Sequence, residues 1–304
     1  MIWDSYDQNA PVLRPIWPLI SPMTVEHRTR PTSLYPPQKK KLLPIVKSYT
    51  VLAPAAQGGK LIMQNEIQKI IKEWGIDLVG VADLSPALAQ LVGQGGTIFE
   101  MYPRAVSLGC RLANEVVDAI GDHGNRALVM NYVHHLYSVV NQRLDQAALS
   151  VAGFLMERGY LAFPVPASQI LSYKTYTGLS PHKTAAHLSG LGWIGRSALL
   201  VTRKYGPRVR FATVYTNAPL PTGTPEKGRC GTCRICVDAC PAGAITGETF
   251  SEEKPRDHIY DAKSCNEYMR ERRLSLLGKH VFGGNCGLCV QSCPFGKPRL
   301  KKTR

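Results

Sequence analysis

Cys230-Gly-Thr-Cys233-Arg-Ile-Cys236-Val-Asp-Ala-Cys240-Pro241 gathers four cysteines with the spacing C-x2-C-x2-C-x3-C-P. In a second set, Cys265 stands alone and Cys286-Gly-Leu-Cys289-Val-Gln-Ser-Cys293-Pro294 repeats the ending C-x2-C-x3-C-P. Of the nine cysteines, only Cys110 lies outside the two sets. Thiolates at this spacing bind iron–sulfur clusters, so the two sets predict one-electron chemistry.

The spacing also indicates how the thiolates divide between two 4Fe–4S clusters. Three cysteines two residues apart can cover three corners of a cubane, whereas the cysteine after x3 binds the other cluster in two-cluster ferredoxins. The proline that follows this last cysteine suits a chain reversal, because its φ is fixed and it has no N–H. We therefore assign Cys230, Cys233, Cys236 and Cys293 to cluster 1, and Cys240, Cys265, Cys286 and Cys289 to cluster 2.

Zinc and disulfides are the alternative uses of these cysteines. All-cysteine zinc sites usually consist of separated C-x2-C pairs, unlike the three closely spaced cysteines that begin the first set. Disulfides form in oxidising compartments, and the sequence shows no charged segment followed by the apolar core of a secretory signal. Cys110 lies in an apolar stretch and is expected to be a small buried residue rather than a ligand.

Length and charge narrow the class of protein. The 304 residues suffice for two domains. No apolar run reaches the ~18 residues of a membrane span, so we expect a cytoplasmic protein without membrane contact. The formal net charge of +15 is spread evenly, because residues 1–62, 63–229 and 230–304 each carry +5. Part of this basicity balances the negative charge that two thiolate-bound clusters would add.

Composition divides the chain into four segments. Residues 1–62 hold 9 of the 22 prolines and no sustained apolar period, which indicates a disordered extension or a start codon assigned too far upstream. Residues 63–228 are expected to form an α/β domain, and residues 229–297 a small two-cluster ferredoxin-like domain. Residues 298–304 form a basic tail, expected to be solvated; an acidic redox partner or RNA is the alternative contact for it.

Residues 63–228 alternate between helical and strand-like patterns, which predicts the fold class α+β (mixed α/β). Apolar residues at helical spacing predict helices over residues 63–74, 132–158 and 181–188. Strand-like runs cover residues 76–82, 105–112, 160–165, 197–202 and 209–216.

The segment Gly190-Leu-Gly192-Trp193-Ile-Gly195 matches the pattern G-x-G-x-x-G of dinucleotide-binding proteins. That pattern needs a strand before it, a helix opening within it and an acidic residue about 20 positions later. Here a predicted helix precedes the glycines, a strand-like run follows them, and residues 210–220 contain no acid. We infer that the glycines instead let the backbone approach something flat and bulky.

Three features together resemble the epoxyqueuosine reductase family, which is related more distantly to the reductive dehalogenases. They are His187-Leu-Ser-Gly-Leu-Gly-Trp-Ile-Gly-Arg196, the first cysteine set after it, and the split second set. The family's AGLGW-x-GK appears here as Ser189-Gly-Leu-Gly-Trp-Ile-Gly-Arg196, and Cys265-Asn-Glu-Tyr268 resembles its Cys-Ile-Ser-Tyr. The resemblance covers residues 63–297.

The resemblance implies a corrinoid-binding, nitroreductase-related domain followed by the two-cluster domain. It further implies that electrons from the clusters reduce cobalamin, which then attacks or reduces a substrate while a side chain supplies protons. The residues that it implies for corrinoid binding are Gly190, Gly192, Trp193 and Gly195.

One position departs from the family. Its acidic proton donor lies in a Val-Asp-Ser-Ala-Pro-like segment, where this chain has Pro166 within Val165-Pro166-Ala167-Ser168. Extra residues follow within 172–183, and Tyr176 and His182 among them are candidate proton donors, with ordinary loop residues as the alternative. The departure favours a substrate other than epoxyqueuosine.

Two functions follow from these observations. One is a reductase of a small molecule or modified nucleoside, tRNA included, supplied with electrons by a low-potential donor such as a ferredoxin or flavodoxin. The other is a ferredoxin-like electron-transfer protein that serves a partner enzyme without turnover of its own. An RNA-binding protein with structural clusters would need a basic surface interleaved with aromatic residues, which the sequence does not show.

Overall fold

The computed structural model describes residues 57–169, 171–172, 174–278 and 286–297. All of them lie in one compact unit, residues 50–304. The expected disordered extension, apart from its last residues, and the basic tail 298–304 lie outside the described residues. Among the described residues, no helix has the length and apolar character needed to cross a membrane.

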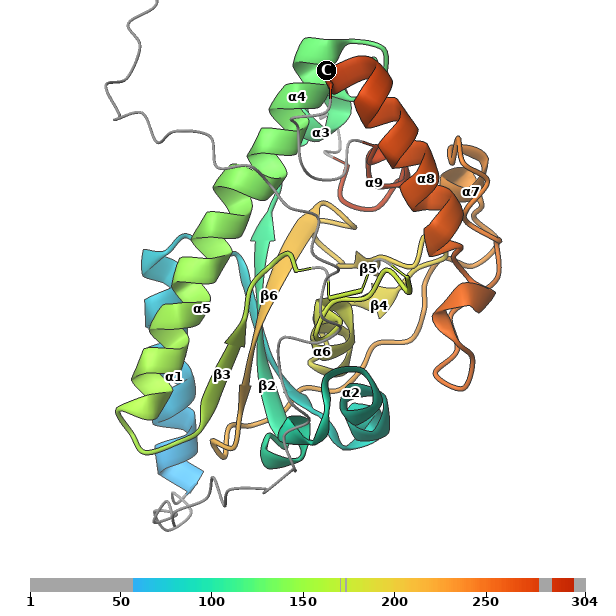
Figure 1. Ribbon diagram of the computed structural model, residues 1–304. Helices are drawn as coiled ribbons and strands as arrows, with labels where there is room; N and C mark the ends of the chain where they lie inside the picture. Colours follow the sequence, from blue (N-terminus) through green and yellow to red (C-terminus); the bar gives the residue numbers. More distant parts are fainter. Residues whose placement is uncertain (1–56, 170, 173, 279–285, 298–304) are drawn as a thin grey trace, which may run out of the picture. The chain divides into compact units, whose positions relative to one another are not determined.

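Helices and strands are interspersed from residue 57 to residue 216, and helices follow β6 (Val209–Thr216) (Figure 1). The α-helices are α1 (Gln57–Glu73), α2 (Leu88–Gly95), α3 (Asn114–Ala119), α4 (Arg126–His134), α5 (Asn141–Met156), α6 (His182–Leu188), α7 (Ile235–Asp238), α8 (Ala262–Arg272) and α9 (Leu288–Gln291). The strands are β1 (Leu78–Asp83), β2 (Arg104–Arg111), β3 (Ala162–Val165), β4 (Trp193–Ile194), β5 (Leu200–Val201) and β6 (Val209–Thr216).

The main sheet has the order β1-β2-β6-β3, and every neighbouring pair is antiparallel. β2 and β6 form its centre, with Val106 opposite Val214 and Leu108 opposite Ala212. Both central strands are buried on both faces, which explains their continuous apolar runs. The expected mixed α/β fold class is confirmed.

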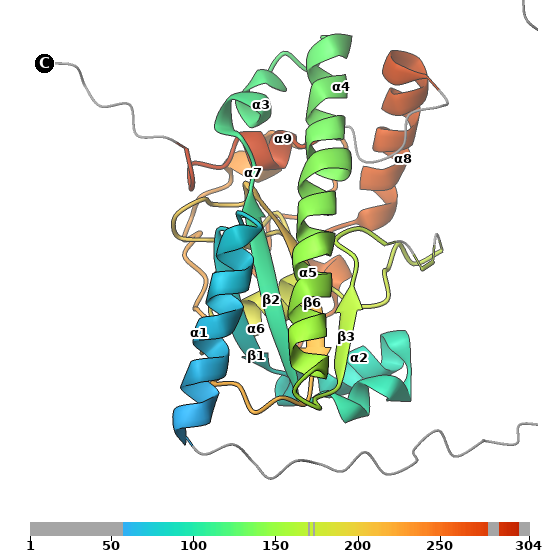
Figure 2. The ribbon, with the colours of Figure 1, turned by 90° about the vertical axis from the view of Figure 1, so that its left-hand side faces the viewer.

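Helices cover both faces of this sheet. α1 and the long α4–α5 segment lie against one face, which Figure 2 shows from the helix side. α2 and α6 lie against the other face, where Phe99, Tyr102 and Tyr215 form an aromatic cluster. A π-helical segment over His135–Val140 joins α4 to α5, so α4 and α5 form one continuous helix.

Most predicted elements agree with the structure, and three differ. The helix predicted over residues 132–158 begins earlier, as α4 at Arg126, because the Asn125 side chain caps it. The helix predicted from residue 63 begins at Gln57 instead, because no proline or glycine after Gly59 interrupts it. The strand predicted over residues 197–202 shrinks to Leu200–Val201, because Ala198 has a positive φ of 57° and turns the chain. The dinucleotide pattern is excluded by the order of elements, since α6 precedes the glycines and β4 contains Trp193.

A buried arginine ties the sheet to the cysteine-bearing segment. Arg208, just before β6, is 1% exposed, and its Nη2 lies 2.6 Å from Asp118 Oδ1 at the end of α3. The same Nη2 donates to the carbonyl of Gln291 in α9 at 3.3 Å, and Nη1 donates to Asn114 Oδ1. Since a buried charge is stable only when paired and hydrogen-bonded, Arg208 fixes α9 and its Cys289 against α3.

Candidate functional site

The cysteine thiols form two groups. Electrostatic interactions join Cys236 and Cys293 with Cys230 and Cys233. They likewise join Cys265, Cys286 and Cys289 with Cys240. The thiols that interact within each group are those that the spacing assigned to one cluster, and among the described residues no three of them are arranged as a closed metal site. Cys289 also interacts with Cys236, so the two groups adjoin.

Burial, followed by neighbouring thiols, raises the pKa of five of these cysteines, which are Cys236, Cys265, Cys286, Cys289 and Cys293. The pKa of Cys293 rises to about 11, chiefly because burial penalises the thiolate and then because of Cys236. Burial raises the pKa of Cys289 still more strongly. Such thiols lose their protons to solvent when a metal ion binds the sulfur and compensates the negative charge of the thiolate, as iron does.

The glycine-rich segment lies against the first group of thiols. A Cβ placed on Gly195 would lie 3.5 Å from Cys230 Sγ. Arg196 donates from Nη2 to the carbonyl of Gly231 at 2.7 Å and from Nη1 to the carbonyl of Gly247. The segment therefore supports the loop that carries Cys230.

The other glycines of this segment approach protein backbone. A Cβ on Gly190 would lie 2.6 Å from the carbonyl oxygen of Thr224, and one on Gly192 would overlap the carbonyl of Val201. Trp193 is 1% exposed and packs edge-on against Phe295, with ring centroids 4.9 Å apart. These contacts account for the glycines and the tryptophan as parts of the chain's own packing.

A large cavity of about 940 Å³ lies between α6 and the cysteine-bearing segment. Ile194 and His187 line it from the glycine-rich side, and Tyr260 and Met269 line it from the other. Its volume is within the ~300–1,000 Å³ typical of small-molecule and cofactor sites. Gly190, Gly192, Trp193 and Gly195 are not among its lining residues.

Tyr260 connects this cavity to the second group of thiols. It lines the cavity, and its phenol lies close enough to the Cys265 thiol for the two groups to interact electrostatically. Its backbone position is fixed by a bridge to Ile245. Tyr260 thus lies at the wall of the cavity, next to the thiol of Cys265.

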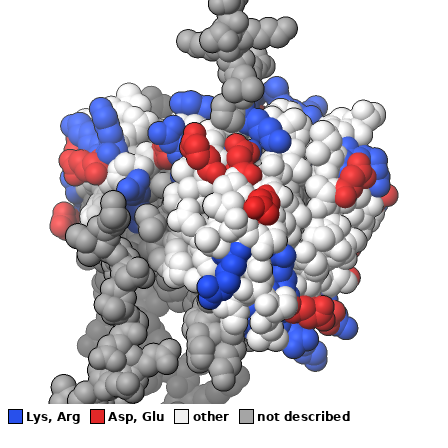
Figure 3. All heavy atoms as spheres, turned by 90° about the horizontal axis from the view of Figure 1, so that it is seen from above, with Lys and Arg blue, Asp and Glu red and all other residues white. Residues whose placement is uncertain are grey.

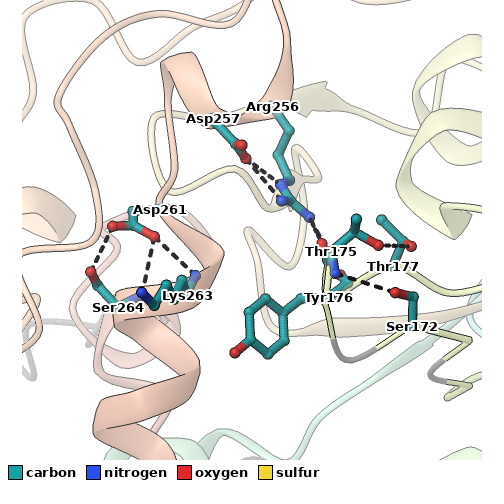
Figure 4. Close-up of polar contacts among 9 residues, drawn as sticks. All are labelled: Ser172, Thr175, Tyr176, Thr177, Arg256, Asp257, Asp261, Lys263 and Ser264. Atoms are coloured by element: carbon teal, nitrogen blue, oxygen red, sulfur yellow. Dashed lines mark hydrogen bonds and ion pairs between the residues drawn. The ribbon is translucent and has the colours of Figure 1, made fainter.

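Tyr176 lies in a tight turn at the edge of the large cavity. Its φ of 51° is unusual for a residue with a side chain, and such strain persists only where neighbours enforce it. Arg256 provides this support, donating from Nη1 to the carbonyls of Thr175 and Tyr176 at 3.2 and 3.3 Å. Figure 4 shows the Tyr176 ring pointing away from the turn toward the side of α8.

His182 lies apart from Tyr176, in a smaller cavity of about 330 Å³. Its Nε2 donates to the carbonyl of Pro166 at 2.8 Å, so its Nδ1 accepts from the hydroxyl of Thr213 at 2.9 Å. Burial, and to a lesser degree Arg210, lowers the pKa of His182 to about 4. The imidazole is therefore neutral at pH 7, with both nitrogens engaged.

The sequence analysis predicted no functional role for Lys183. It lines both cavities, and its Nζ donates to the carbonyl of Ala198 at 2.8 Å. Burial, followed by the charge of Arg256, lowers the pKa of Lys183 to about 8. Its inward position follows from the fold, because Ala198 lies 15 residues away in sequence.

The neutral state of His182 leads to a pH-dependent stability. Its folded pKa of about 4 is below the unfolded value of about 6.5, so the unfolded chain binds more protons in this window. We expect the free energy of unfolding to fall as pH drops below 6.5, by at most about 1.4 kcal/mol per pH unit from this residue.

The variant His182→Gln isolates this effect, since an amide can donate to Pro166 and accept from Thr213. Anaerobic urea unfolding of both proteins at pH 6.5 and pH 5 measures it. His123 and His135, whose pKa values burial also lowers, act equally in both proteins. An equal pH dependence in the variant would contradict the neutral, hydrogen-bonded state of His182.

Comparison with known proteins agrees with this geometry. Residues 229–296 match the family model of a 4Fe-4S double cluster binding domain. The chain is thus a protein with binding sites for two 4Fe–4S clusters, and this part of the sequence interpretation is confirmed.

Similar proteins of known name place this chain among a smaller group of iron–sulfur proteins. The epoxyqueuosine reductase of Xanthomonas campestris is 29% identical over 193 residues, which cover 60% of this chain and 48% of that enzyme. This chain is therefore related to the epoxyqueuosine reductases, as its motifs indicated. It spans less than half the length of that relative.

Two solved structures show the same fold. One is an epoxyqueuosine reductase with an epoxyqueuosine-modified tRNA-Tyr stem loop, with a TM-score of 0.53, 19% identity and coverage of 78% of this chain and 66% of that chain. The other is a reductive dehalogenase whose structure suggests a mechanism for B12-dependent dehalogenation, with a TM-score of 0.52, 19% identity and coverage of 83% and 34%. These likenesses bear on the fold alone.

Proposed function

We propose that this chain is an iron–sulfur reductase in which two 4Fe–4S clusters supply electrons to a corrinoid, cobalamin, in the large cavity. The observation that carries the proposal is the position of Tyr260, which lines the cavity and interacts electrostatically with the Cys265 thiol. A ligand in this cavity would therefore lie next to cluster 2. The B12 dependence named for the similar dehalogenase supports the choice of cofactor.

The cluster ligands follow from the two groups of thiols. We assign Cys230, Cys233, Cys236 and Cys293 to cluster 1, and Cys240, Cys265, Cys286 and Cys289 to cluster 2. The interaction of Cys289 with Cys236 supports electron transfer between the clusters, because it brings the two sets next to one another. Since each set borrows a cysteine from the other, neither site is complete until both halves of residues 229–296 have folded.

The residues around the large cavity fit a corrinoid. Ile194, Leu188 and Met269 offer apolar surface to a flat ring, whereas His187 and Gln90 offer polar atoms at its edges. Bound cobalamin would supply the low-valent cobalt chemistry that no side chain can perform. In this arrangement Gly190, Gly192, Trp193 and Gly195 hold the segment that presents Ile194.

We further propose that Tyr176 delivers the proton. It lines the cavity, its backbone is clamped by Arg256, and Lys183 of the same cavity is a cation that stabilises a developing phenolate. His182, the second candidate, would position Pro166 and Thr213, since its neutral imidazole is a poor acid at pH 7.

Replacing Tyr176 with Phe should reduce turnover by about 10²–10⁴-fold, the usual contribution of a positioned acid. The assay is anaerobic reduction of epoxyqueuosine-modified tRNA stem loop or tetrachloroethene with titanium(III) as electron source. Iron and cobalt content should stay at the wild-type value, because Tyr176 binds neither. If the variant reduces the compound that the wild type turns over at the wild-type rate, Tyr176 is not the proton donor.

The substrate and partners complete the proposal. The relatives' names suggest a modified nucleoside or a small organic molecule as substrate, and a ferredoxin or flavodoxin is the electron donor that the clusters suit. Positive and negative side chains are interspersed on the face seen in Figure 3, so this face offers no uniformly basic surface to tRNA. Eight thiols kept for clusters fit the reducing cytoplasm.

Corrinoid retention tests this function. Chain reconstituted anaerobically with iron, sulfide and cobalamin should retain one cobalt and about eight irons per chain after desalting, with corrinoid bands beside the broad iron–sulfur absorption. Retention of the iron without cobalt would refute the reductase and leave a ferredoxin-like electron-transfer protein.

A further inference from the structure

We propose that the smaller cavity binds the oxyanion group, a carboxylate or a phosphate, of a small and otherwise apolar organic molecule through Arg210 and Lys183. That this molecule is the substrate rests on the reductase function proposed above. The binding of the anion does not, because it depends only on the cavity's own residues.

The charges around this cavity have one sign. Lys183 and Arg210 line it, and no Asp or Glu is among its lining residues. His182 adds no charge, since burial keeps its imidazole neutral while its two nitrogens bond Pro166 and Thr213. A concave site with two cations and no acid has a positive potential that an anion neutralises.

Neither cation has a carboxylate partner among the described residues. Arg210 donates from Nε to Asn141 Oδ1 at 2.6 Å and from Nη2 to the carbonyl of Ala167, and its guanidinium lies 4.7 Å from the Tyr137 ring. Asp145 accepts from the N–H of Ala167 and forms no ion pair with Arg210. Within the part of the chain that the structure describes, Nη1 of Arg210 bonds no other group and can donate to a ligand.

Lys183 is a partly buried ammonium with a single carbonyl partner, Ala198. Burial of a cation without a counterion is costly, and the attraction of a bound anion offsets the hydration energy that the ammonium loses. An arginine and a lysine together suit a carboxylate or a phosphate, because the guanidinium offers a planar fork and the ammonium a point charge.

The rest of the lining limits the molecule that carries the anion. Val165, Leu199, Leu200 and Phe211 form an apolar surface, and Ser168 and Gln169 add polar groups. The volume of about 330 Å³ is at the small end of ligand sites. Since Lys183 also lines the large cavity, a molecule anchored here would extend its apolar part toward the cofactor side.

Calorimetric titration of the reconstituted protein at low ionic strength tests the site. The probes are cyclohexanecarboxylate, cyclohexyl phosphate and the neutral cyclohexanecarboxamide. We expect one or both anions to bind at least tenfold more tightly than the amide, and which of them does so distinguishes a carboxylate from a phosphate ligand. Equal binding of all three, or binding of none, would overturn the proposal.

Variants locate the binding on the two cations. Arg210→Gln and Lys183→Gln should each weaken anion binding at least tenfold, whereas Arg203→Gln, whose native guanidinium pairs with Glu226 at 2.8 Å, should leave it unchanged. If Arg210→Gln fails to fold because the bond to Asn141 is lost, Lys183→Gln decides alone, and wild-type affinity in it refutes the site. Cobalt retention in the same samples shows separately whether the reductase function stands.

Discussion

Replacing Cys265 with Ala should lower the iron content from about eight to about four atoms per chain. In the proposed assignment, Cys265 is the ligand of cluster 2 from outside both C-x2-C-x3-C-P runs, and it lies on α8. Its thiol interacts with Cys286 and Cys240, whereas the thiols assigned to cluster 1 are linked to one another. A 4Fe–4S cluster needs four ligands, so the loss should be confined to cluster 2.

The matched control is Cys110→Ala, because Cys110 is buried in β2 and belongs to neither group of thiols. Iron and acid-labile sulfide analysis with low-temperature EPR of the reduced proteins separates the outcomes. One cluster signal should vanish in Cys265→Ala, and both should persist in Cys110→Ala. Unchanged iron in Cys265→Ala would show that the assignment of ligands is wrong.

Replacing Gly206 with Ala should destabilise the protein by about 2–4 kcal/mol and remove iron from cluster 1. Gly206 has φ 57°, which costs an alanine about 1–2 kcal/mol. A Cβ here would also overlap the carbonyl of Phe295, two residues after Cys293. The segment that carries Cys293 must then move, and cluster 1 loses its fourth ligand.

The control for this variant is Gly228→Ala, because Gly228 has no positive φ and a Cβ there would meet no atom within 4 Å. Iron content and anaerobic urea unfolding measure both consequences. Wild-type iron in Gly206→Ala would mean that contact with the turn at Gly206 does not hold Cys293 in place.

The sequence predicted the features that depend on neighbouring residues. The cysteine spacing indicated both sets of thiols, because loop geometry limits which corners of a cluster one run can reach. The strand over residues 209–216 was predicted at its observed bounds, since its apolar run is continuous and buried on both faces. The single cysteine outside the sets, Cys110, is buried as expected.

Features that depend on distant residues were not predicted. Arg208 joins α3 and α9, but its own neighbours in sequence give no sign of those partners. The same holds for Tyr260, whose role follows from a cavity and a thiol that meet only in the folded chain. The glycines of residues 190–195 were expected to approach a flat ligand, whereas in the structure Gly190 and Gly192 approach Thr224 and Val201.

EPR of the chain loaded with both kinds of cofactor tests most directly whether the clusters adjoin a corrinoid in the large cavity. The signal of cobalt(II) in bound cobalamin is recorded first with oxidised clusters and then after cluster reduction. If Tyr260 separates cluster 2 from the cofactor as proposed, cluster reduction should broaden or split the cobalt signal through spin–spin coupling. An identical cobalt signal in both states would contradict this arrangement.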